Sequence, residues 1–356
     1  MNSTKKISPW AWVPTLYFAQ GIPYFIVNNI SVLMFAKMGV PNGEMALFTS
    51  LLYLPWTIKP FWSPFIDIIK TKRWWTISMQ ILMSIAFILL TLSIPKPDEA
   101  MIAAGTTPIS LFTITLILFI ITAFASATHD IAADGFYMLA LKQSDQAAFV
   151  GIRSTFYRLA SIFGQGVLVA IAGTIELKYK DIPLSWTITM LVTAVMFSLV
   201  TFYHLFAIPK PTADKSVLTP GTASAKAIFK EFGRTFATYF TKPGVWLAIA
   251  FMLLYRLPEA FLIKMCMPFL VASKEAGGLE LSTAEVGIVY GTIGVIFLTV
   301  GGILGGLFAS RIGLKKSIWW MAACMTLPCL TFVYLAIGQP DNLFAISTAI
   351  AIEQFG

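Results

Sequence analysis

The chain has 356 residues, of which 57% are hydrophobic and 12% are charged, and its mean hydropathy is +0.79. This composition leaves too little polar surface for a soluble protein of that length, so it excludes that class and indicates a protein of the lipid bilayer. The formal net charge of +8 is explained by basic residues in the predicted inner loops, and nucleic-acid binding need not be invoked.

Ten apolar segments are predicted as membrane helices, because a helix needs about 20 apolar residues to cross the hydrocarbon core. The tenth is a short stub. The fold predicted from them is an all-α polytopic membrane protein with about nine to ten transmembrane helices. The segments cover residues 10–35, 45–69, 74–94, 108–137, 149–175, 184–208, 243–270, 284–309, 318–336 and the residues from 343 onward.

Two loops share one pattern and divide the chain into repeated halves. Residues 63–73 and 306–316 each join two apolar segments, and they lie 243 residues apart. Such repeats are typical of membrane transporters, here two six-helix bundles in the complete form. The same offset places the end of a second half near residue 451, so we expect a chain truncated within segment ten. A truncated membrane protein that transports nothing is one alternative.

The basic residues predict the orientation and the domains. With a cytoplasmic N-terminus, fifteen lysines and arginines fall on the inner side and five on the outer side. We expect an N-terminal bundle over 1–208, a cytoplasmic linker over 209–242 and an incomplete C-terminal bundle over 243–356. Within the linker, residues 223–240 have the spacing of an amphipathic helix on the inner membrane surface, although a solvated linker with a helical patch fits equally.

Segment two contains a lysine among prolines. Lys59 lies between Pro55 and Pro60, more than a helical turn from the inner loop. Its ammonium group either lines a central cavity or snorkels toward the inner interface, and snorkelling is the favoured interpretation.

Segment four contains two carboxylates at membrane depth, where a charge costs at least a few kcal/mol and usually has a function. Asp130 and Asp134 are four residues apart and share one helix face. Their repulsion and burial favour proton uptake by at least one of them, which is what proton coupling requires. In segment five Arg158 is the preferred counter-charge, because Arg153 lies near the start of its segment. The alternative is a permanent buried pair that only holds the two segments together.

Segment seven is the predicted solute-binding region. Pro258 lies between Arg256 and Glu259, and Lys264 follows within two turns. A proline bends the helix and frees backbone groups, and transporters tend to bind solutes at such breaks. Arg256 or Lys264 would meet a solute carboxylate. An Arg256–Glu259 pair within one helix is the alternative.

The repeated loop resembles the loop motif of the major facilitator superfamily, Gly-x-x-x-Asp-Arg-x-Gly-Arg-Arg. The match is loose, since Ser63 replaces the leading glycine in the first copy and Ser310 replaces the aspartate in the second. In that family the motif latches the two domains in one conformation by charge contacts. The resemblance implies this role for Asp67, Lys72, Arg73, Arg311 and Lys315.

Segment four also resembles the AmpG-type muropeptide permeases through Thr128-His129-Asp130-Ile-Ala-Ala-Asp134-Gly. Residues 54–67 and 18–23 are similar to the same family, and these signatures are shared with the acetyl-CoA transporters of eukaryotic membranes. The resemblance implies import of N-acetylglucosaminyl-1,6-anhydro-N-acetylmuramyl peptides with protons across the bacterial inner membrane, by alternating access. We expect a monomer without cofactor. Another solute, acetyl-CoA-like, sugar phosphate or peptide, is the alternative.

One cluster of side chains could indicate an enzyme. His129 with Asp130 and Asp134 would suggest a metal site, but the chain has only two histidines, the other being His204, and no HExxH pattern. We therefore predict neither an enzyme nor a metal centre. A transport-like receptor or scaffold is the third class.

Overall fold

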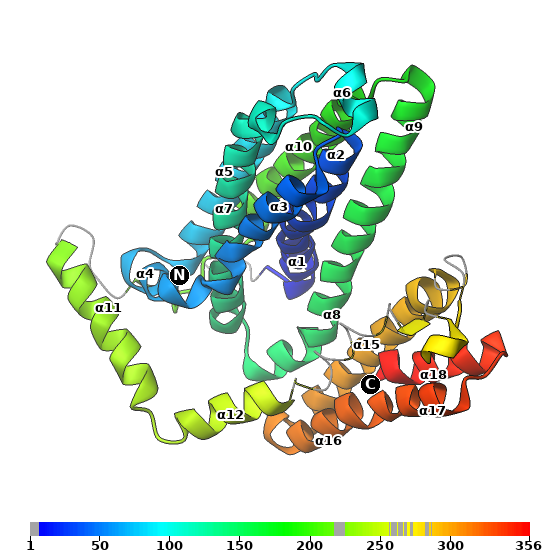
Figure 1. The fold of residues 1–356 in the computed structure, drawn as a ribbon. Coiled ribbons are helices and arrows are strands. Elements are labelled where there is room, and N and C mark those ends of the chain that lie inside the picture. The colour runs from blue at the N-terminus through cyan, green and yellow to red at the C-terminus, as the bar shows by residue number, and fades with distance from the viewer. Residues whose placement is uncertain are drawn as a thin grey trace. The chain divides into compact units, whose positions relative to one another are not determined.

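The computed structural model describes residues 7–216, 225–255, 257, 262, 266, 269–270, 273–281, 285 and 287–356. Over these residues the regular structure is helical, with no strand (Figure 1). The all-α class predicted from the sequence is confirmed. The chain divides into two compact units, Met1–Lys142 with Phe156–Thr235 and Gln143–Thr155 with Phe236–Gly356.

Two helices of the first unit begin at residues whose side chains cap them. The Thr71 hydroxyl accepts a hydrogen bond from the Trp74 N–H at the start of α5, and the Asp181 carboxylate does the same for the Leu184 N–H of α10. Two π-helical stretches, η1 (Ile26–Ile30) and η4 (Phe163–Leu168), widen the rods that α1 and α2, and α8 and α9, would otherwise form. The helices are α1 (Pro9–Phe25), α2 (Ser31–Lys37), α3 (Asn42–Thr57), α4 (Ser63–Ile69), α5 (Lys72–Ser93), α6 (Glu99–Ala104), α7 (Thr113–Ala140), the second part of α8 (Gln143–Ile162), α9 (Val169–Tyr179) and α10 (Ile182–Ala207).

The core of this unit lies around α5, which packs against both α7 and α10. Phe87 of α5 meets Phe197 of α10 edge-on, with ring centroids 5.3 Å apart, and both rings are fully buried. Ala123 and Ala127 of α7 are also fully buried. Close packing around small residues holds helices together in a bilayer, where lipid tails are as apolar as the side chains.

Gly21 of α1 lies where α1 and α8 approach each other closely. A Cβ built there would lie 2.6 Å from the Ala160 Cβ and 3.1 Å from the Tyr157 carbonyl oxygen, neither of which can swing away. We expect Gly21→Ala to lower the free energy of unfolding by about 1–3 kcal/mol, measured by thermal unfolding in detergent.

Two further variants control this measurement. Adding Ala160→Gly to Gly21→Ala should recover most of the lost stability, because it removes the clashing methyl group. Gly173→Ala should be close to neutral, since no atom lies within 4 Å of a Cβ built there. A double variant no more stable than Gly21→Ala alone would show that the approach of α1 and α8 does not set the cost.

The described helices of the second unit pack around α18, which contacts both α15 and the π-helical stretch η6 (Gly287–Gly294). Its buried core includes Leu270, Val289, Leu335 and Ile350, none of which has exposed surface. The helices are α12 (Val245–Tyr255), α15 (Val295–Ile312), α16 (Leu314–Thr326), α17 (Leu330–Gly338) and α18 (Leu343–Phe355).

Seven helical rods among the described residues are long and apolar enough to cross a membrane, or eight if a pair bent by 75° is one span. Segment two is the main departure from the predicted spans. The chain breaks there into α3, the 3₁₀ turn Lys59–Phe61 and α4, because Pro60 supplies no N–H and fixes its own φ. The first part of segment seven forms α12, whereas most residues from 256 to 268 lie outside the described residues.

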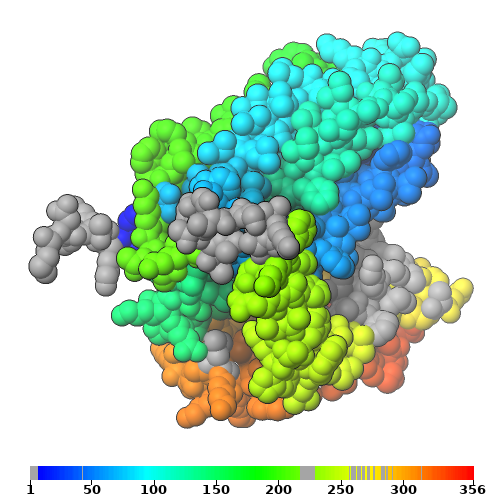
Figure 2. Space-filling view, turned by 90° about the vertical axis from the view of Figure 1, so that its left-hand side faces the viewer, coloured from blue at the N-terminus to red at the C-terminus, as the bar shows by residue number. Residues whose placement is uncertain are grey.

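The amphipathic pattern of the linker forms α11 (Ala225–Phe240), close to the predicted 223–240. The Phe65 ring of α4 stacks on Phe232 with centroids 4.7 Å apart and meets Phe229 edge-on at 5.9 Å. Phe229 is still 66% exposed. The yellow-green helix α11 lies open on the face shown in Figure 2.

Candidate functional site

An ion pair joins α7 to the break in segment two. The Lys59 Nζ lies 2.6 Å from the Asp130 Oδ2, and the two side chains are 27% and 10% exposed. Because Lys59 starts the 3₁₀ turn between α3 and α4, its side chain reaches the centre of α7. The ammonium group of Lys59 therefore bonds to α7. The interpretation favoured from the sequence, in which Lys59 snorkels to the inner interface, differs from this contact.

The two aspartates of α7 have different partners. The Asp134 Oδ1 accepts a 2.9 Å hydrogen bond from the Tyr17 hydroxyl of α1. Asp130 has only 7% exposed surface, and its Oδ1 has no hydrogen-bond partner among the described residues. One oxygen of Asp130 is thus fixed by Lys59, while the other lies near the Trp56 indole without a hydrogen bond of full geometry and has a lone pair that can take a proton.

Arg158 does not pair with the aspartates in this structure. Its Nη1 is buried and has no hydrogen-bond partner in the described part of the chain. Asp130 is paired with Lys59 instead. The counter-charge expected for Asp130 from the sequence is Arg158, and the observed partner is a different residue. Arg158 is half-buried, and no ion pair joins it to a carboxylate among the described residues.

Beside the ion pair runs a hydrogen-bonded chain through four helices. The Gln80 Nε2 of α5 lies 2.9 Å from the His129 Nε2 of α7, and the Gln80 Oε1 lies 2.9 Å from the His204 Nδ1 of α10. The His204 Nε2 in turn lies 2.9 Å from the Thr15 Oγ1 of α1. Gln80, His129 and His204 have no exposed surface. In the orientation given, His204 donates to the Gln80 oxygen and the Gln80 amide donates to His129.

Sequence reasoning missed this chain of side chains. Gln80 is uncharged, so a search for ionisable groups passes it over, although a glutamine in the middle of an apolar segment is itself a signal. His204 was noted only to weigh a metal site. Among the described residues no group of three or more His, Cys, Asp or Glu side chains is arranged to hold a metal ion.

The first copy of the repeated loop ties helices of the first unit together. Lys72 forms an ion pair with Asp67. Arg73 donates from Nε to the Ile208 carbonyl at 3.1 Å and from Nη2 to the Leu205 carbonyl at 2.9 Å, as suits a cation at a helix C-terminus.

A carboxylate from the start of the linker caps the next helix. Asp214 accepts the backbone N–H groups of Lys72 at 2.7 Å and Arg73 at 2.9 Å, at the N-terminus of α5. This contact could not be predicted from the sequence, since Asp214 lies 141 residues or more from its partners.

The second copy of the loop differs in backbone. Gly313 ends α15 with φ +84°, in the region that favours glycine, and separates Arg311 from Lys315. At the equivalent position of the first copy Lys70 is extended, with φ −144° and ψ 176°. The predicted solute-binding residues Arg256, Glu259 and Lys264 lie outside the described residues.

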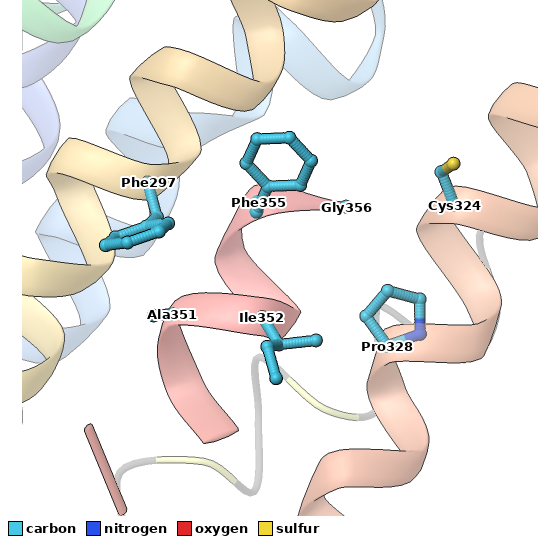
Figure 3. Close-up of a pocket in the computed structure, with 7 residues that line it drawn as sticks. All are labelled: Phe297, Cys324, Pro328, Ala351, Ile352, Phe355 and Gly356. Atoms are coloured by element: carbon cyan, nitrogen blue, oxygen red, sulfur yellow. The ribbon is translucent and has the colours of Figure 1, made fainter. Parts of the chain in front are cut away.

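A cavity of about 380 Å³ in the second unit contains none of these groups (Figure 3). Its lining is apolar apart from one thiol, so it offers no charge to a polar solute. It is lined by Phe297, Cys324, Pro328, Ala351, Ile352, Phe355 and Gly356.

The chain is similar to several named transporters. "Putative transporter AmpG 4" of Rickettsia conorii (strain ATCC VR-613 / Malish 7) is 25% identical over 353 residues, covering 96% of this chain and 77% of that protein. "Anhydromuropeptide permease" of Escherichia coli (strain K12) is 25% identical over 317 residues, covering 85% of this chain and 56% of the permease. This chain thus spans little more than half the length of that relative.

Solved structures and a family model show the fold. FucP, a major facilitator superfamily transporter solved in the outward conformation, has a TM-score of 0.65 at 16% identity, covering 98% of this chain and 82% of FucP. A variant of the Escherichia coli fucose:proton symporter FucP has a TM-score of 0.68 at 15% identity, covering 98% and 81%. The family model described as Major Facilitator Superfamily matches residues 15–356. With a match over nearly its whole length, the chain belongs to the major facilitator superfamily of membrane transporters.

Proposed function

We propose that this protein is a proton-coupled importer of anhydromuropeptides released from the bacterial cell wall, acting in the inner membrane with its N-terminus in the cytoplasm. The observation that carries the proposal is the Lys59–Asp130 ion pair in the middle of a membrane helix. An ionisable pair at this depth is costly and is typical of proton and solute pathways. The solute class comes from the name of the Escherichia coli relative, "Anhydromuropeptide permease".

In the proposed cycle, a proton that reaches the Oδ1 of Asp130 neutralises the carboxylate and releases Lys59. The released ammonium group and Arg158 are then two cations in one unit, and both attract an anionic solute. Asp134, held by Tyr17, is the second proposed proton site. Return of Lys59 to an ionised Asp130 follows loss of the proton on the other side of the membrane.

The second half and the loops complete the proposal. Arg256, Glu259 and Lys264 are proposed to bind the solute, with the two cations meeting the carboxylates of its peptide. The latch role is proposed for the Asp67–Lys72 pair with Arg73, and for Arg311 and Lys315 in the second copy. Within the first unit, the contacts of Arg73 to α10 support the idea that this loop transmits movement between helices.

Uptake of radiolabelled anhydromuropeptide into right-side-out vesicles tests the function. We expect this chain to support uptake that an uncoupler reduces at least severalfold, and the Escherichia coli permease serves as the positive control. An uptake rate that the uncoupler does not change would contradict proton coupling. Well-folded protein that takes up no muropeptide would contradict the solute assignment.

A further inference from the structure

We infer that the first unit carries a sugar-binding face, in which an aromatic wall lies between the Lys59–Asp130 pair and two exposed amide side chains. This inference rests on the proposed function, because it states which part of the solute this unit holds. None of the aromatic or amide residues concerned was singled out from the sequence as a binding residue.

The wall is built around Tyr24 of α1. Its ring centroid lies 5.3 Å from Trp56 and 6.4 Å from Tyr53, both of α3, and 6.2 Å from Tyr157 of α8. Phe25 closes the cluster at 5.4 Å from Tyr157. Rings that serve only as core are buried, but Tyr53 is 48% exposed, and Tyr24, Trp56 and Tyr157 are half-buried. Three helices thus present aromatic surface at one place.

One end of the wall is the ion pair. The Asp130 charge acts on both Tyr24 and Tyr157, and Asp130 lies beside Trp56. The Trp56 indole lies close enough to act as a hydrogen-bond donor toward the Asp130 carboxylate. Neither the Trp56 Nε1 nor the Asp130 Oδ1 has a hydrogen bond of full geometry among the described residues, and both atoms are buried. A ligand hydroxyl group between them would complete the bonding of both.

The other end consists of amides on the two π-helical stretches. Asn29 of η1 and Gln165 of η4 are exposed and share a long hydrogen bond of 3.4 Å. The Gln165 Nε2 also donates to the Ser161 hydroxyl at 2.8 Å. Exposed amides do not face lipid, where their groups would stay unpaired, so this side of the unit meets water, solute or protein.

The dimensions of the face suit a sugar. Asn29 follows Tyr24 by five residues and Gln165 follows Tyr157 by eight, which corresponds to about 8 and 12 Å along the helices. A pyranose ring offers C–H groups on its flat faces and hydroxyl or acetamido groups around its rim. Its flat face packs on the negative face of an aromatic ring, while its rim needs donors and acceptors like those at either end. A lipid acyl chain, the alternative ligand for an exposed aromatic surface, has no polar groups to bond to the amides or to the ion pair.

Equilibrium binding of N,N′-diacetylchitobiose to the purified chain in lipid nanodiscs tests the inference. We expect Trp56→Leu and Tyr157→Leu to weaken binding roughly tenfold each, as removal of a stacking ring does. Tyr157→Phe keeps the ring and should retain most of the affinity. The matched control is Trp74→Leu, which removes an indole that is 45% exposed at the start of α5, and it should bind as the unchanged chain does.

The outcomes separate this inference from the proposed function. Thermal unfolding of each variant identifies any that misfolds. If Tyr157→Leu misfolds, the comparison of Trp56→Leu with Tyr157→Phe still tests the inference. Equal binding by the unchanged chain, Trp56→Leu and Tyr157→Leu would overturn the inference, as would no binding by a chain that imports muropeptide in an uncoupler-sensitive manner. Binding that depends on the rings in a chain without muropeptide uptake would support the face and refute the importer.

Discussion

Asp130→Asn is expected to abolish proton-driven uptake, with initial rates in vesicles falling at least about a hundredfold under a fixed pH gradient. The substitution removes the carboxyl group that takes the proton. It also leaves the Lys59 ammonium group without its counter-charge, and breaking a buried ion pair in this way costs about 3–5 kcal/mol. Uptake and thermal stability should therefore fall together.

Two variants separate these effects. Asp130→Asn combined with Lys59→Gln removes both charges, and we expect it to regain stability without regaining uptake. Asp98→Asn, a change in an exposed carboxylate outside the helices of the site, should behave as the unchanged chain does. Uncoupler-sensitive uptake by Asp130→Asn at an undiminished rate would exclude Asp130 as the proton site and leave Asp134 as the candidate.

Gln80→Leu is expected to be the most destabilising change in the core of the first unit. Leucine fills similar space but leaves the His129 Nε2 and the His204 Nδ1 without partners, each at a cost of about 1–3 kcal/mol. The free energy of unfolding should fall by their sum, and because His129 precedes Asp130 on α7, uptake should fall as well. Thermal unfolding in detergent and vesicle uptake measure the two effects.

The matched controls use the same chemistry elsewhere. Gln143→Leu changes an exposed glutamine at the start of α8 and should alter stability little. Gln80→Leu together with His129→Leu and His204→Leu removes every polar group that Gln80 joins, and it should be more stable than Gln80→Leu alone. If Gln80→Leu unfolds at the same temperature as the unchanged chain, the hydrogen-bonded chain contributes nothing to the fold.

The helices could be predicted and Asp130 could be chosen as a candidate site residue, because apolar length and charge at membrane depth are both visible along the chain. The partner of Asp130 could not. Arg158 was chosen because it lies in the next segment, whereas Lys59 lies 71 residues away and meets Asp130 only through helix packing. Neighbouring segments need not present their charged faces to each other, and a single sequence contains no measure of helix rotation.

The position of the break in segment two shows a second limit. Segment two contains three prolines, but Pro55 is accommodated inside α3 and Pro64 lies in the first turn of α4. Only at Pro60 does the helix give way to a 3₁₀ turn. Membrane helices tolerate proline when neighbouring groups satisfy the freed carbonyl, so the break depends on packing that the sequence does not display.

The π-helical turns η1 and η4 lie within the proposed sugar-binding face, and they allow its side chains to change position along and around the helices. A π-helical turn contains one residue more than the helix around it needs, and it can move along the rod as that residue passes to the next turn. Each such step rotates the side chains it crosses by about 100° while the rest of the rod stays in place. Tyr24 and Tyr157 precede the two wide turns, and Asn29 and Gln165 lie within them. In the proposed sugar-binding face, the aromatic wall would then stay in contact with a sugar ring while the amides turn away from it, without either helix unwinding.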